Sequence, residues 1–370
     1  MNRGLMIILL LPCSIMVALL IMTQLKAVSR RTVRTGIKSP KWKHIASNQS
    51  DYIAAYRTCP LLDNQDNCSL SRLESIASWQ LVSQLPDLTT LQDSCIAGQI
   101  IGISGDSLSR QSFHSIVCLF HAYGFIVSLS DSDTTATISS NTIPSKTLLT
   151  FHWTSNHLNP YLIGFDGQRP SPTLKKGLHP SLQSLLSNHR LDHLLLNTGL
   201  WLDPSSFLDR INPTTGSPET WLTEYEKTIT ETINALSTTN TLASQKTKIT
   251  FRNTPFRHFK TVQDSSNPLG GCPKSRDDWS EGWGPNFNSS VTDYPLSYAE
   301  IQQNVRLEEF IHEARREHPE LQWQDVLDAA FIAENREDAH TSFTDCSHYC
   351  LPGVPDAWNM IWLARYWDSC

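Results

Sequence analysis

Residues 99–124 read QIIGISGDSLSRQSFHSIVCLFHAYG and predict a strand, a sharp turn and a helix in direct succession. The first six residues form a short apolar run rich in β-branched side chains, which is typical of a buried strand. Apolar residues then recur at helical spacing, at Phe113, Ile116, Val117 and Phe120. Gly124 follows as a plausible helix cap.

The rest of the chain repeats this alternation of strands and helices. Further strands are predicted at residues 125–129, 147–153, 193–196 and 248–251. Helices are predicted after Ser217-Pro218-Glu219, with Tyr225, Ile229 and Ile233 on one face, from Ser297 to about Arg316, and from near Asp356 onward. We therefore expect an α/β fold with a mostly parallel sheet flanked by helices, in which functional groups gather at the strand ends.

The turn Gly105-Asp106-Ser107 lies at such a strand end. Glycine permits the tight turn, and Ser107 then lies at a helix N-terminus, where unpaired N–H groups and the positive end of the dipole can stabilise an oxyanion. The alternative is that Asp106 or Ser107 only caps the helix. A nucleophilic serine requires a base elsewhere in the chain.

The candidate base lies near the C-terminus, in Asp345-Cys346-Ser347-His348-Tyr349-Cys350. Asp345 and His348 are three residues apart, so one turn can place the carboxylate beside the imidazole, where it would orient the ring as a proton acceptor for Ser107. The alternatives are that Cys346, His348 and Cys350 bind zinc, or that the cysteines form disulfides. We expect disulfides and no metal.

The composition of the 370 residues is that of a globular protein. The net charge of -6 gives no reason to expect a nucleic acid as partner. The N-terminus carries an uncharged apolar stretch over residues 4–22, long enough to cross a membrane. A cleaved signal peptide is the alternative, but its apolar stretch would be shorter. We expect a cytosolic tail over 1–3, an anchor over 4–22, a basic stem over 23–55 and a folded domain over 56–370.

The sequence gives conflicting indications of which side of the membrane the folded domain occupies. Seven basic residues between Lys26 and Lys43 follow the span, which favours a cytosolic C-terminus. The even set of eight cysteines outside the span favours an oxidising compartment. The sequence also contains three glycosylation sequons, at Asn48, Asn67 and Asn288. Together these features favour a lumenal domain.

Two motifs make the chain resemble a known family. GDSLSR at 105–110 followed by Cys118, and DCSHYCLPGVPDAWN at 345–359, resemble the trichome-birefringence-like polysaccharide O-acetyltransferases of the PC-esterase group, in the GDSL/SGNH superfamily. Intermediate stretches agree in order, and the resemblance spans roughly residues 56 to 366. They are Asn197-Thr198-Gly199-Leu200-Trp201, Phe251-Arg252-Asn253-Thr254-Pro255 with His258-Phe259, Gly270-Gly271-Cys272 and Arg336-Glu337-Asp338-Ala339-His340.

The resemblance implies an SGNH-hydrolase-like fold in a single-pass type II membrane protein of the Golgi, with the enzyme domain in the lumen. It implies an acyl-enzyme mechanism with Ser107 as nucleophile, His348 as general acid and base, and Asp345 as the orienting carboxylate. Gly105, Asp106, Asn197 and Arg252 are candidates for the oxyanion or substrate site. A turn-stabilising role for Asn197 and a structural role for Arg252 are the alternatives.

The resemblance also implies disulfides, because the cysteine positions can be matched. The implied pairs are Cys59–Cys118, Cys68–Cys350 and Cys272–Cys346. The family's early Cys-Asp-Leu segment is missing here, and we expect the remaining Cys95 and Cys370 to pair with each other. Two further departures, Tyr349 and Leu202 in place of tryptophans, leave the predicted triad intact. Among the eleven tryptophans, Trp279 and Trp283 are the best candidates for stacking on a sugar.

The expected function is transfer of an acetyl group, from a donor acting as co-substrate, to a polysaccharide hydroxyl. No bound cofactor is expected. The nearest alternative is an esterase with water as acceptor, which would use the same residues. A non-catalytic glycan-binding protein on the same fold is a third possibility, against which the intact Ser107, Asp345 and His348 argue.

Overall fold

The described part of the structure, a computed structural model, lies within the compact unit Trp42–Cys370. It comprises residues 42–44, 50–62, 68–69, 73–74, 76, 79–81, 96–130, 133–139, 146–153, 178, 180–200, 220–258, 297–342 and 345–367. Among these residues, no helix combines the length and the apolar character that a membrane crossing requires. Outside them lie the predicted span 4–22, the three sequon asparagines Asn48, Asn67 and Asn288, and also Cys95, Cys272, Cys370, Leu202, Trp279 and Trp283.

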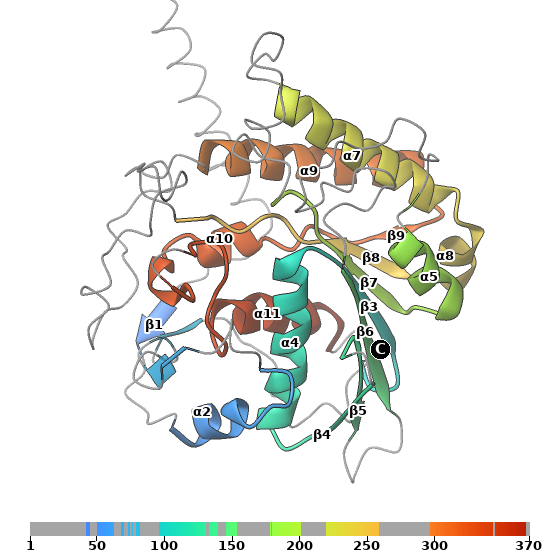
Figure 1. Ribbon diagram of the computed structural model, residues 1–370. Helices are drawn as coiled ribbons and strands as arrows, with labels where there is room; N and C mark the ends of the chain where they lie inside the picture. Colours follow the sequence, from blue (N-terminus) through green and yellow to red (C-terminus); the bar gives the residue numbers. More distant parts are fainter. Residues whose placement is uncertain are drawn as a thin grey trace, which may run out of the picture. The chain divides into compact units, whose positions relative to one another are not determined.

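A seven-stranded sheet, in the order β4-β5-β6-β3-β7-β8-β9, forms the centre of this unit (Figure 1). Its strands are β3 (Ile100–Gly105), β4 (Ile126–Leu129), β5 (Thr135–Ser139), β6 (Thr147–Trp153), β7 (His193–Leu196), β8 (Lys248–Phe251) and β9 (Gln322–Trp323). The five strands from β6 to β9 are parallel to one another, whereas β5 pairs antiparallel with both β6 and the edge strand β4. The predicted, mostly parallel sheet is thus a mixed sheet.

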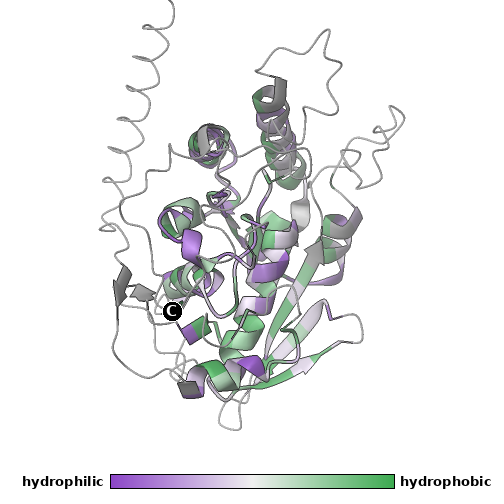
Figure 2. Ribbon diagram, turned by 60° about the vertical axis from the view of Figure 1, so that its left-hand side comes forward, coloured by the Kyte–Doolittle hydropathy of each residue, from purple (hydrophilic) through white to green (hydrophobic). Residues whose placement is uncertain are grey.

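Helices flank this sheet. They are α2 (Ser50–Arg57), α4 (Ser107–Ala122), α5 (Pro180–Asn188), α7 (Thr220–Ser237), α8 (Asn240–Gln245), α9 (Ser297–Glu317), α10 (Ala329–Ala333), η5 (Glu337–Ala339) and α11 (Val354–Trp367). A separate two-stranded sheet pairs β1 (Trp42–His44) with β2 (Trp79–Leu81). Hydrophobic segments on the strands are interrupted by paler ones, and hydrophobic and hydrophilic residues are mixed along the helices (Figure 2).

The two hydrophobic cores on the sheet explain which helices cover which face. One core joins α2, α4, α10 and α11 to residues such as Ile103 and Leu195. The other joins α5, α7, α8 and α9 to residues such as Leu194 and Leu196. Leu194, Leu195 and Leu196 are consecutive in β7 and alternate between the cores, as the period of two in a strand requires. A strand buried on both faces reads as an unbroken apolar run, here the three leucines after His193.

One predicted boundary is displaced. The sequence assigns residues 23–55 to a stem, yet α2 begins at Ser50. Ile53 and Tyr56 on this helix are fully buried in the core that contains α4. The helix is short and has a weakly apolar composition, so its burial depends on tertiary packing. Regular structure therefore begins inside the stretch predicted as stem.

Candidate functional site

The carboxyl ends of three neighbouring parallel strands converge on the candidate site. Ser107 begins α4 two residues after β3 ends, Asn197 directly follows β7, and Arg252 directly follows β8. Gly105 makes this convergence possible, because a Cβ atom built on it would lie 2.7 Å from the carbonyl oxygen of Asn197 and 2.3 Å from Ser109 Oγ. Only a residue without a side chain lets the two strand ends approach so closely.

Asp106 and Ser107 divide the two roles that the sequence left open. Asp106 is the N-cap of α4, and its Oδ1 accepts a hydrogen bond of 3.0 Å from the backbone N–H of Leu108. Burial raises the pKa of Asp106, against the opposing effects of Arg252 and the Leu108 N–H. Because Asp106 performs the capping, the Ser107 hydroxyl is available for another contact.

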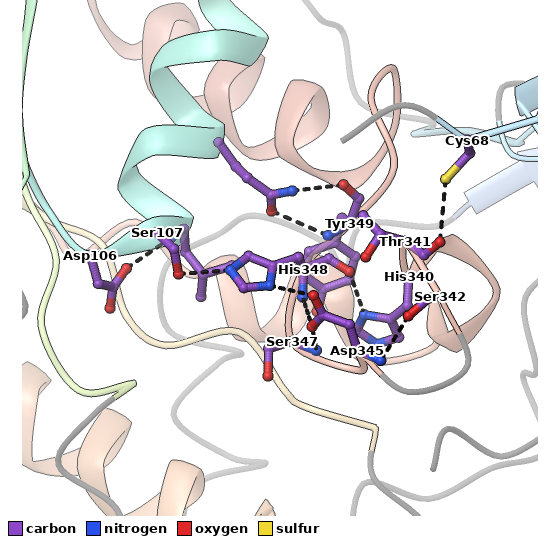
Figure 3. Close-up of polar contacts among 12 residues, drawn as sticks. Cys68, Asp106, Ser107, His340, Thr341, Ser342, Asp345, Ser347, His348 and Tyr349 are labelled. Carbon is purple, nitrogen blue, oxygen red and sulfur yellow. Dashed lines mark hydrogen bonds and ion pairs between the residues drawn. The ribbon is translucent and has the colours of Figure 1, made fainter. Parts of the chain in front are cut away.

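That contact is with His348 (Figure 3). Ser107 Oγ lies 2.7 Å from His348 Nε2, and His348 Nδ1 lies 2.7 Å from Asp345 Oδ2. A carboxylate only accepts hydrogen bonds, so the proton lies on Nδ1 and Nε2 accepts from the Ser107 hydroxyl. The structure thus brings together Ser107, His348 and Asp345, which the sequence predicts as nucleophile, base and orienting carboxylate.

Asp345 also shapes the turn that presents His348. Its Oδ1 accepts hydrogen bonds of 3.2 Å from the backbone N–H groups of Ser347 and His348. Burial by itself would raise the pKa of Asp345, but the hydrogen bond and charge of His348, together with these N–H groups, lower the pKa to about 2. Asp345 is therefore an ionised carboxylate at any physiological pH.

Gln111 fixes the residue that follows His348. Gln111 lies one turn after Ser107 on α4 and is fully buried. Its Nε2 donates to the carbonyl oxygen of Tyr349 at 2.8 Å, and its Oε1 accepts from the Tyr349 N–H at 3.2 Å. The Gln111 side chain therefore bonds both the N–H and the C=O of Tyr349, as a residue on a neighbouring strand does. It links α4 directly to the loop that carries His348.

Two disulfides tie the N-terminal segment to these elements. Cys59 is bonded to Cys118 on α4, and Cys68 is bonded to Cys350, two residues after His348. These are pairs that the resemblance implies. Cys346 is also disulfide-bonded, and its predicted partner Cys272 lies outside the described residues. Since Cys346 and Cys350 are in disulfides, neither offers a thiolate to zinc, and the described residues contain no cluster suited to a metal ion.

Asn197 and Arg252 occupy structural positions. Asn197 is almost fully buried, and its Nδ2 donates to the carbonyl oxygen of Arg252 at 3.1 Å. Its position beside Gly105 keeps it next to the turn that bears Ser107. A turn-stabilising hydrogen bond, the alternative considered from the sequence, is thus present.

Arg252 lies in the interior beside α4, in line with the structural role that was one of its two alternatives. Its side chain is fully buried, and its Nη1 donates to the carbonyl oxygen of Leu108 at 3.0 Å and to Ser112 Oγ. The guanidinium also lies 5.0 Å from the centre of the Trp358 ring. Burial lowers the pKa of Arg252 to about 10. The chain uses this cation to hold the first turns of α4 in place.

Gln111, His258 and His340 border the site without having been predicted. The sequence did not single out Gln111, because Ser109, Arg110 and Ser112 beside it are polar as well. His258 and His340 belong to motifs that carry the resemblance. Their contacts join residues far apart in the sequence, so no local pattern revealed them.

The sequence of the chain is similar to one protein family and to several named plant proteins. The PC-Esterase family, described as "GDSL/SGNH-like Acyl-Esterase family found in Pmr5 and Cas1p", matches residues 94–365. Xylan O-acetyltransferase 3 of Oryza sativa subsp. japonica is 24% identical over 300 residues, covering 70% of this chain and 59% of that protein. Protein trichome birefringence-like 39 of Arabidopsis thaliana is 24% identical over 341 residues, covering 84% and 82%. The match thus spans little more than half the length of the rice protein.

Proposed function

Because the chain belongs to the PC-Esterase family of GDSL/SGNH-like acyl-esterases, we propose that it transfers an acetyl group to a polysaccharide hydroxyl through an acetyl-serine intermediate. The observation that carries this proposal is the continuous line of hydrogen bonds from Asp345 through His348 to Ser107. A serine is activated when a base touches it and a carboxylate orients that base.

In the first step the Ser107 oxygen attacks the acetyl carbonyl of the donor while its proton passes to His348 Nε2. The negative charge that develops on the carbonyl oxygen falls at the N-terminus of α4, where the first N–H groups lack helical partners. The bond to the donor's leaving group then breaks, and His348 returns the proton to that group. The product is acetyl-Ser107.

In the second step a sugar hydroxyl attacks the acetyl carbonyl, and His348 accepts the hydroxyl proton. Collapse of the tetrahedral intermediate breaks the bond to Ser107 and restores its proton. Asp345, held as a carboxylate, stabilises the imidazolium that forms in both steps. The reaction requires an acetyl donor as co-substrate, and every proton transfer uses a group of this chain.

The acceptor class is proposed from the relatives. Two rice proteins similar to this chain are named xylan O-acetyltransferases. A polysaccharide is therefore the first acceptor to test. We also propose a lumenal site of action in a membrane-anchored Golgi protein, which the disulfides support because such bonds persist in oxidising compartments.

An acetyl esterase is the second candidate, and one observation favours it. The side chains of His348 and Asp345 are 26% and 40% exposed, so solvent reaches them. Water could then replace the sugar hydroxyl in the second step. The family description, which names esterases, is in line with this alternative.

Replacing Ser107 by alanine tests the proposal. The Ser107→Ala variant of the full chain should lose at least a thousandfold in turnover, roughly the cost of removing such a nucleophile. The assay measures the mass of a polysaccharide incubated with an acetyl donor, and free acetate measures esterase activity. The control is Ser184→Ala on α5, where the hydroxyl accepts an exposed hydrogen bond of 3.0 Å from Asn188 Nδ2. Undiminished transfer by Ser107→Ala would refute the mechanism.

A further inference from the structure

A buried pair of histidines lies directly behind the loop that carries His348. His258 and His340 are both fully buried, and His258 Nδ1 lies 2.7 Å from His340 Nε2. The outer nitrogens of the pair contact backbone carbonyls. His258 Nε2 lies 3.1 Å from the carbonyl oxygen of Glu334, and His340 Nδ1 lies 2.9 Å from that of His348.

Counting protons on these four nitrogens gives the charge of the pair. A carbonyl oxygen only accepts hydrogen bonds, so both outer nitrogens must carry a proton. The inner contact of 2.7 Å requires a third proton, because two lone pairs at that distance would repel each other. Two neutral imidazoles carry only two N–H protons in total. With three, the pair carries one positive charge.

We infer that His340 is a buried imidazolium, which donates one N–H to His258 and the other to the carbonyl of His348, and that it is a positioning residue for His348. Burial lowers the pKa of His258 to about 4, which makes His258 the neutral acceptor and assigns the third proton to His340. The positioning half of the inference rests on the proposed function, whereas the charge of the pair does not.

The surroundings of His340 suit a cation. Its ring stacks on the Tyr349 ring, with centres 4.5 Å apart and planes inclined by 27°, and the electron-rich face of an aromatic ring attracts positive charge. Three buried arginines act on Tyr349, and each has a carboxylate near it: Arg257 has Glu300, Arg336 has Asp338, and Arg252 has Asp106. Their charges are thus compensated independently of His340.

The hydrogen bond from His340 to the carbonyl of His348 matters for the site because it restrains the peptide group that follows His348. The peptide group between His348 and Tyr349 is bonded at both ends by side chains. His340 donates to its carbonyl oxygen, and Gln111 accepts from its N–H. Thr341 N–H also donates to the same carbonyl, at 3.1 Å. A hydrogen bond from an ionised donor is roughly twice as strong as a neutral one, so the charge of His340 strengthens this restraint on His348.

Magnetic resonance of the full chain, with isotopically labelled histidine ring nitrogens, tests the charge. At neutral pH the His258–His340 pair should show three ring N–H protons, assigned by their loss in His258→Phe and His340→Gln. His193 serves as the internal reference, since burial beside Lys248 lowers the pKa of His193 to about 3 and one N–H proton is expected there. Only two N–H protons on the pair would overturn the inference.

The variants test the positioning role. His340→Gln should lower turnover about tenfold at an unchanged KM, because a small misplacement of His348 weakens its contact with Ser107. The matched control is His193→Gln, which removes a buried histidine from the amino end of β7 and should retain turnover.

In His258→Phe, His340 should revert to a single N–H proton. Full turnover in His340→Gln would remove the positioning role and leave the charge intact, whereas failure of the proposed function would show in Ser107→Ala.

Discussion

The residue that determines how His348 acts is Asp345, which accepts three hydrogen bonds in one turn of chain. One of them fixes the proton of His348 on Nδ1 and leaves Nε2 free to accept from Ser107. If the carboxylate is replaced by an amide, the proton of His348 is no longer fixed on Nδ1, because an amide can place a donor where an acceptor is needed.

Asp345→Asn should therefore keep the fold and lose turnover on the order of 10⁴-fold, as expected when the imidazole takes the wrong tautomer. The Michaelis constant should change little, since the carboxylate does not touch the substrate in the proposed mechanism. Steady-state kinetics of the purified full chain measure both quantities. A loss below tenfold would show that the orientation of His348 depends on other contacts.

The sequence predicted Ser107, His348 and Asp345 because two short motifs carried both the residue types and their local spacing. It missed Gln111 and His340 for a physical reason. Gln111 reaches Tyr349 across 238 positions of sequence, and such contacts leave no periodic pattern. For Arg252 the motif was recognised, but only burial could show that the cation points into the core.

At the scale of elements, the described strands agree closely with the prediction. Residues 147–153, 193–196 and 248–251 coincide with β6, β7 and β8, because each is a short segment rich in apolar or β-branched residues. The sequence did not reveal β5. Its residues alternate between buried and half-buried, and TATIS offers only short side chains for the pattern. β5 lies between β4 and β6, and its pairing with these two neighbours fixes it rather than its own propensity.

The link between α4 and the His348 loop predicts the behaviour of Gln111→Leu. Leucine fills a similar volume but leaves the N–H and carbonyl of Tyr349 without their partner, which costs about 1–3 kcal/mol for each group. We expect a lower melting temperature together with a loss of turnover on the order of tenfold. Thermal unfolding and initial rates, measured on the same preparation, give the two effects.

The matched control is Gln324→Leu, next to β9. The side chain of Gln324 donates a hydrogen bond of 3.2 Å to the carbonyl of Gln322, and the loss of this bond should cost little stability and no turnover. If Gln111→Leu lowered stability but retained full turnover, Gln111 would be a structural residue only.

For the whole molecule, a buried carboxyl group connects three distant segments. Asp356 on α11 accepts hydrogen bonds from Tyr56 on α2 at 2.8 Å and from Ser115 on α4 at 2.7 Å, and also from the Gly353 N–H. Burial raises the pKa of Asp356 to about 6 despite these donors. Protonation of this group therefore favours the folded state.

The sign of the resulting pH dependence follows from this shift. An acid with a raised folded pKa contributes stability below its unfolded pKa, near 4, and loses that contribution as the pH rises to about 6. Asp356 should thus lower the free energy of unfolding by about 3 kcal/mol across this window. Asp345 acts oppositely, because its lowered pKa removes stability only below about 4.

Denaturant unfolding of the wild type and of Asp356→Asn at several pH values measures the difference. The variant should be less stable throughout, because its amide opposes the Gly353 N–H, and should lack the fall between pH 4 and 6. Parallel pH curves for the two proteins would show that Asp356 is ionised in the folded state over the whole range.

The Cys68–Cys350 disulfide spans 282 positions of the chain, whereas Cys59–Cys118 spans only 59. A ribosome delivers the chain from its N-terminus, so the shorter bridge can close while most of the sheet is still unsynthesised. The longer bridge must wait until nearly the whole polypeptide has emerged. Until then Cys68 lacks its native partner, so any disulfide that it forms earlier must be exchanged before Cys68–Cys350 can close.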